Sequence, residues 1–124
     1  MASNRRFRFG PVAMSITLTT NILNPNITSL AGPVGFTATQ PFIILRHIRI
    51  VNKTTSSVTF SLWLGATAGN VAGTEIIGTA TSVAANSAFD WFGALPIEAA
   101  DFLVGGASAA TSLTIQGEGE IGFV

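Results

Sequence analysis

The chain has 124 residues, the length of one domain, and 48% of them are hydrophobic, which is enough to fill a single core. Only 10% are charged, against about 25% in an average soluble domain, so most of the surface must be neutral. The formal net charge is zero, which argues against a general nucleic-acid binder, yet all six basic residues precede residue 54 and all six acidic residues follow residue 74.

The N-terminal residues 1–12 have the composition of an arm. Arginine and phenylalanine alternate within it: Arg5, Arg6, Phe7, Arg8 and Phe9. Ten extended residues reach about 33 to 36 Å, so the arm can dock on a neighbouring copy, with arginines on carboxylates and phenylalanines in pockets. A disordered tail is one alternative, and a nucleic-acid-binding arm whose phenylalanines stack on bases is another. We therefore divide the chain into an arm, residues 1–12, and one domain, residues 13–124.

The domain shows strand signals throughout. Apolar and polar residues follow strand patterns in 14–20, 42–52, 57–65, 75–77, 87–92 and 112–116, the last continuing toward residue 124. A further short strand is expected near 34–39, inside a stretch rich in Pro and Gly. Segment 97–103 predicts either a short helix after Pro96 or, equally, a strand over 101–104.

These elements define the expected architecture. Four polar residues, 53–56, join two of the strands and predict an antiparallel hairpin. Within 42–52, alternation places Arg46 on one face, together with Ile44, Ile48 and Ile50. The opposite face is expected to carry His47, Arg49 and Val51. Short strands with turn residues between them predict an all-β fold, an antiparallel β-sandwich that is jelly-roll-like, with an extended N-terminal arm.

The chain offers little for catalysis, because it has one histidine, no cysteine and no tyrosine. Ser61, His47 and Asp90 supply the residue types of a Ser-His-Asp triad, but no GxSxG elbow is present, and we interpret His47 as a surface or interface residue. Neither phosphate-binding loop, GxxxxGK[ST] nor GxGxxG, occurs. The sequence therefore predicts no enzyme, no cofactor, no metal site and no small-molecule substrate.

Two carboxylates close to the C-terminus, Glu118 and Glu120, lie two residues apart and are expected on one face of a strand. Such a pair occurs in glycosidases and in calcium sites. No aromatic platform or third acidic residue is close in sequence, so we interpret the pair as an acidic edge that faces solvent or a partner. Like charges at this spacing repel, and Arg46, Arg49 or an arginine of a neighbouring copy is expected opposite them.

Three stretches of the chain, taken together, resemble small all-β virion proteins of tailed bacteriophages: RIVNKTTSSVTFSLWLGATAG (49–69), VAANSAFDWFGALPIEAADFLVGG (83–106) and TSLTIQGEGEIG (111–122). In those proteins a strand, an NKT-like turn and a second strand precede a polar strand, a short acidic segment of the AADFL type and a closing strand that ends in glutamate. The resemblance implies a head or tail structural component, above all a capsid decoration (cement) protein. It carries over no catalytic residue, and the arm lies outside it.

The expected function is that of a virion structural protein, made in the host cytoplasm, that binds the outer surface of a phage head and stabilises it. The expected partners are the major capsid protein and copies of the chain itself, with a trimer favoured; nucleic acid and membranes are not expected. A phage neck, tail or fibre protein is one alternative, and a carbohydrate-binding β-sandwich that uses Trp63 and Trp91 is another. The residues expected to bind partners are Arg5, Arg6, Phe7, Arg8, Phe9, Arg46, Arg49, Glu118 and Glu120.

Overall fold

A computed structural model describes residues 5–25, 41–66, 69, 74–98 and 100–123 of the chain. Eight strands lie in these ranges, and no helix does. The strands are β1 (Arg5–Ala13), β2 (Asn21–Leu23), β3 (Pro41–Asn52), β4 (Val58–Gly65), β5 (Glu75–Val83), β6 (Ser87–Ile97), β7 (Phe102–Ala107) and β8 (Leu113–Phe123).

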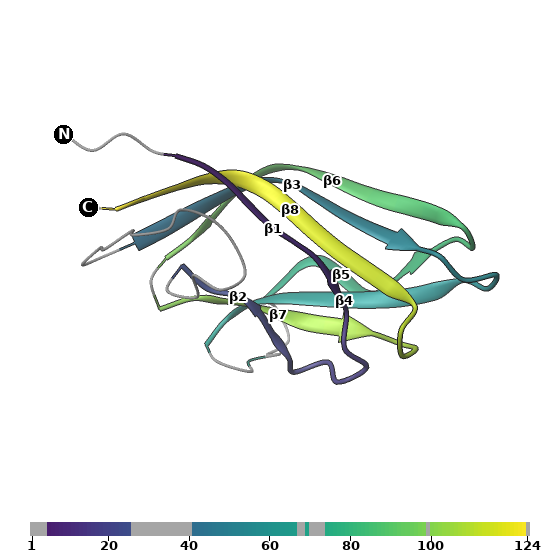
Figure 1. The fold of residues 1–124 in the computed structure, drawn as a ribbon. Coiled ribbons are helices and arrows are strands. Elements are labelled where there is room, and N and C mark those ends of the chain that lie inside the picture. Colours follow the sequence, from purple (N-terminus) through teal and green to yellow (C-terminus); the bar gives the residue numbers. More distant parts are fainter. Residues whose placement is uncertain (1–4, 26–40, 67–68, 70–73, 99, 124) are drawn as a thin grey trace.

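The strands form two four-stranded antiparallel sheets that pack face to face (Figure 1). Sheet A has the order β1-β8-β3-β6 and sheet B has the order β2-β7-β4-β5. Consecutive strands mostly alternate between the sheets, and this order is that of an eight-stranded jelly roll. The prediction of an antiparallel β-sandwich is confirmed.

The core lies between the two sheets and is built from the alternate, inward-facing residues of each strand. Its largest fully buried side chains are Phe9, Phe60, Leu23, Ile43, Leu45, Ile48, Ile50, Leu62, Ile97, Leu103, Leu113 and Ile115. Burial of each such side chain contributes about 1.5–3 kcal/mol. The outward-facing residues of sheet A, by contrast, are mainly polar or charged, and they form the surface described below.

The predicted separate arm is wrong for the part of it that the structure describes. Residues 5–13 form β1, an edge strand of sheet A that pairs with β8 (Figure 1). Phe7 and Phe9 point inward and are buried in the core of their own domain. The two phenylalanines, which were expected to occupy pockets on a neighbouring copy, are thus part of the core of the same chain. Residues 1–4 of the predicted arm lie outside the described residues.

The expected first strand, 14–20, is instead the connection between β1 and β2. Met14 enters the core, whereas Ile16 and Leu18 are exposed, so the alternation there does not mark a buried face. The connection is held to β7, because the amide of Ala107 donates to the carbonyl of Ser15 (2.8 Å) and the amide of Gly105 to that of Thr20 (3.0 Å).

The predicted hairpin of 42–52 and 57–65 is also wrong, although both segments are strands. β3 pairs with β6 and β8 in sheet A, and β4 pairs with β5 and β7 in sheet B. Each strand has a strongly apolar face, and the two faces pack against each other across the core instead of lying side by side in one sheet. The polar residues 53–56 therefore cross from one sheet to the other.

The remaining strand predictions differ mainly in length. The segments 75–77 and 87–92 are the starts of the longer strands β5 and β6. The described residues of segment 97–103 contain no helix. The Asp101 amide donates to the Glu98 carbonyl (2.9 Å) just before β7 begins at Phe102, in agreement with the strand alternative. The expected short strand at 34–39 lies outside the described residues.

Candidate interaction surface on sheet A

The outer face of sheet A carries most of the residues that the sequence singled out, and the pairing of β1 with β8 organises it. In register, Phe9 lies opposite Gly117, Phe7 opposite Gly119, and Arg8 opposite Glu118. A Cβ added to Gly117 would lie 2.4 Å from Cε1 of Phe9, so the missing side chain makes room for the ring. The segments RFRF (6–9) and GEGE (117–120) therefore complement each other on both faces of the sheet. Phenylalanines lie opposite glycines on the inner face, and arginines lie opposite glutamates on the outer face.

A bulge in β3 changes which side chains reach this surface. The register of β3 shifts between Leu45 and His47 against both neighbouring strands. Leu45 and Ile48 are both buried, so the two residues between them, Arg46 and His47, share the outer face. The predicted placement of Arg46 on one face with Ile48 and Ile50 is wrong, because strict alternation does not allow for a bulge.

His47 is held between two carboxylates and an aromatic ring. Its Nε2 lies 2.7 Å from Oδ1 of Asp90 on β6, and its Nδ1 lies 3.3 Å from Oε1 of Glu118 on β8. The imidazole also stacks on Phe92, with ring centroids 4.5 Å apart and planes 7° from parallel. The two carboxylates and the Phe92 ring together hold the imidazole in one orientation on the outer face of sheet A.

The two β3 arginines take different partners. Arg46 forms an ion pair with Glu120 (2.8 Å), as the sequence predicted for the C-terminal carboxylates. Arg49 instead contacts Asp90 (3.5 Å), and the side chain that contacts Glu118 is His47 (3.3 Å). These groups are partly exposed, so each pair contributes only about 0–1 kcal/mol to stability.

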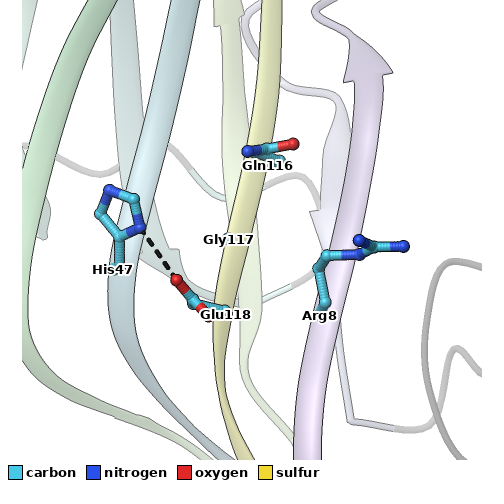
Figure 2. A pocket seen from close by; sticks show the side chains of 5 residues that line it. All are labelled: Arg8, His47, Gln116, Gly117 and Glu118. Carbon is cyan, nitrogen blue, oxygen red and sulfur yellow. Dashed lines mark hydrogen bonds and ion pairs between the residues drawn. The ribbon is translucent and has the colours of Figure 1, made fainter.

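The arginines of β1 form no ion pair with the carboxylates that the structure describes. Arg5, Arg6 and Arg8 are exposed, and within the described residues no carboxylate lies within ion-pair distance of them. Figure 2 shows Glu118 turned toward His47, while the guanidinium of Arg8 is directed away from both. Arg8 and His47 flank a shallow depression of about 230 Å³ that Gln116, Gly117 and Glu118 complete.

The residues of the hypothetical Ser-His-Asp triad do not meet. His47 and Asp90 lie on the outer face of sheet A, whereas Ser61 belongs to β4 of sheet B, where its Oγ accepts a hydrogen bond from the Ala80 amide (2.8 Å). The described residues contain no group of three or more His, Cys, Asp or Glu side chains placed to hold a metal ion.

Trp63 and Trp91 do not form the exposed platform that a carbohydrate site would need. Trp63 lies in β4 with only 5% of its surface accessible, and Trp91 packs against the hydrophobic core. The exposed aromatic residue of the described surface is Phe92, at 72%, which is not among the residues predicted to bind partners. It alternates with Trp91 along β6, so period-two counting from Phe89, which packs against the core, places it on the outer face.

A second exposed feature lies on the other side of the molecule. Ile16 and Leu18, in the β1–β2 connection, are 57% and 40% exposed. A Cβ added to Gly106 of β7 would meet the carbonyl oxygens of Ser15 and Thr17, so the connection passes directly over the sheet B backbone. Alternation along 14–20 predicts a strand with one buried face, so neither Ile16 nor Leu18 was expected on the surface.

Comparisons with known proteins gave no assignment. Neither a scan against protein-family models nor a search of curated proteins found a match to this chain. In the part of the chain that the structure describes, no helix has the length and hydropathy to cross a membrane.

Proposed function

We propose that the protein is a virion structural protein of a tailed bacteriophage, a decoration protein that binds the outer surface of the head through contacts with the major capsid protein. The jelly-roll fold supports this proposal, since viral capsid domains commonly use it. The low charge of the chain supports it as well, because a neutral surface of small residues is cheaply desolvated on contact with other subunits. In the same proposal the protein assembles with copies of itself, first of all as a trimer.

The observation that carries the proposal is the exposed pair Ile16 and Leu18. Large aliphatic side chains on a surface mark contact sites when they are held in place beside one another. Here the hydrogen bonds from Ala107 and Gly105 fix the connection against β7. Thr17 is fixed further, because its amide donates to Oγ of Ser15 (3.0 Å). A rigid apolar pair costs little conformational entropy on binding.

Co-sedimentation with phage heads tests the proposal. Purified protein is added to heads that lack it, the particles are pelleted, and the bound copies are counted by quantitative mass spectrometry. We expect hundreds of copies per particle for a decoration protein, whereas about six or twelve copies would place the protein in the neck or tail. No association with particles would contradict the proposal in both forms.

Paired variants then ask which surface makes the contact. The double variant Ile16→Ser, Leu18→Ser should lose most of the bound copies, because it removes the apolar pair on sheet B. The matched control is Phe92→Ser, which removes an exposed apolar residue from sheet A. If the control variant detaches and the double variant stays bound, the attachment surface is on sheet A and the argument from Ile16 and Leu18 is wrong.

A further inference from the structure

We infer that the free edge of β1, with Arg5, Arg6 and Arg8, accepts an extended acidic segment of a partner protein as an added strand of sheet A. The inference deepens the proposed function and rests on it for the identity of the partner, a subunit of the particle. It assigns the kind of surface that the partner must offer: an exposed strand or chain end with carboxylates at alternate positions.

One side of the β1 backbone has no neighbouring strand among the described residues. This strand is at the edge of sheet A, and among the described residues it pairs only with β8. Alternate N–H and C=O groups of an edge strand point away from its neighbour and can pair with another chain. Pro11 has no N–H to donate, so the usable edge is residues 5–9.

The charged side chains around this edge are distributed unevenly. The basic and acidic side chains of β3, β6 and β8 pair with one another: His47 with Asp90 and Glu118, and Arg46 with Glu120. The β1 arginines are not included in these pairs, although Arg8 lies in register with Glu118. They leave a positive edge on a molecule whose formal net charge is zero. Charge complementarity therefore selects an acidic partner.

The spacing of the arginines along β1 matches that of alternate residues in an added strand. Arg6 and Arg8 flank the buried Phe7 and are two residues apart, so both project from the outer face about 7 Å from each other. Carboxylates at alternate positions of an added strand have the same spacing and would meet them on that face. Figure 2 shows the guanidinium of Arg8 directed away from Glu118 of β8, on the side of β1 where the added strand would lie.

A protein strand fits this edge better than a nucleic acid does. Binding of single strands depends on aromatic side chains that stack on bases, in addition to cations on phosphates. Phe7 and Phe9 are buried in the core, Phe9 against Gly117 of β8, and are not available for stacking. The edge offers backbone hydrogen-bonding groups and arginines, which are the groups that recognise an acidic strand.

The test uses the full-length, isotopically labelled protein and a short synthetic peptide of alternating Glu and Thr. Titration followed by amide chemical shifts should move the β1 resonances of residues 5–9, and binding should weaken as salt is added. Arg8→Gln should bind the peptide roughly threefold more weakly, as expected for one exposed ion pair. The matched control, Lys53→Gln, removes one exposed positive charge away from β1 and should bind normally.

Three further probes make the result decisive. A Lys and Thr peptide should not bind, and a Glu and Thr peptide N-methylated at alternate residues should bind much more weakly, because it cannot form the strand. Equal binding of the methylated peptide, equal loss in both Gln variants, or tighter binding of an oligo-dT single strand would overturn the inference. None of these measurements involves phage particles, so failure of the edge to bind is distinct from failure of the protein to associate with heads.

Discussion

Gly117 shows how single residues fix the surface of sheet A. Its missing side chain lets the Phe9 ring lie over the β8 backbone, and this contact helps set the register that brings Arg8 beside Glu118. Gly117→Ala would force a methyl group into the ring, and we expect it to lower the free energy of unfolding by about 1–3 kcal/mol. Gly65→Ala is the control, because nothing lies within 4 Å of a Cβ added there. Urea denaturation of both variants checks the prediction; equal stability would mean that the ring moves aside freely.

His47 is the residue that connects three strands of sheet A, through Asp90, Glu118 and Phe92. His47→Ala removes two partly exposed ion contacts and one ring stack. We expect the free energy of unfolding to fall by about 1–2 kcal/mol, because exposed pairs are weak and the stack adds a comparable amount. The variant should also release Glu118, which can then turn to Arg8. A thermal or urea unfolding curve indistinguishable from that of the parent protein would show that the three contacts contribute nothing.

At the scale of elements, β1 is part of the fold and not an appendage. Phe9→Ala should cost about 3–5 kcal/mol, as for other buried phenylalanines. Removal of residues 1–9 should cost more, because it also withdraws Phe7 from the core and leaves β8 without its neighbour. Phe92→Ala, at an exposed position of β6, serves as the control and should change stability by much less. If urea denaturation shows the truncated chain to be as stable as the full chain, residues 1–9 are an arm that is separate from the folded domain.

Elements were predictable where one face of a strand alternates cleanly, as in β4 and in the C-terminal half of β3. The partners of those strands were not, because a short polar link permits either a hairpin or a crossing between sheets. The bulge at Arg46 was invisible to strict alternation. The β1–β8 pair did leave a signal, since RFRF and GEGE complement each other when written antiparallel. Patterns confined to one segment do not reveal such a pair, because the two segments are more than 100 residues apart in sequence and each is judged by its own composition.

For the whole molecule, the segregation of charge along the chain has a structural origin. The sheet order places basic β3 between acidic β6 and β8, so residues far apart in sequence become neighbours, as in the pair of Arg46 and Glu120. Much of the division into a basic and an acidic half is therefore pairing inside one domain. This pairing does not include the exposed arginines at the edge of β1.

That division predicts different responses of folding and attachment to salt. The core is apolar and its ion pairs are exposed, so the free energy of unfolding should change by no more than about 1 kcal/mol from low salt to about 1 M. Attachment to phage heads should weaken over the same range, because the Debye length falls from about 10 Å at 0.1 M to about 3 Å at 1 M and screens the β1 arginines from an acidic partner. Co-sedimentation and urea denaturation in the same buffers measure both. Arg8→Gln should reduce the salt response of attachment and Lys53→Gln should not. If attachment is insensitive to salt in all three proteins, the apolar pair Ile16 and Leu18 carries the contact without the arginine edge.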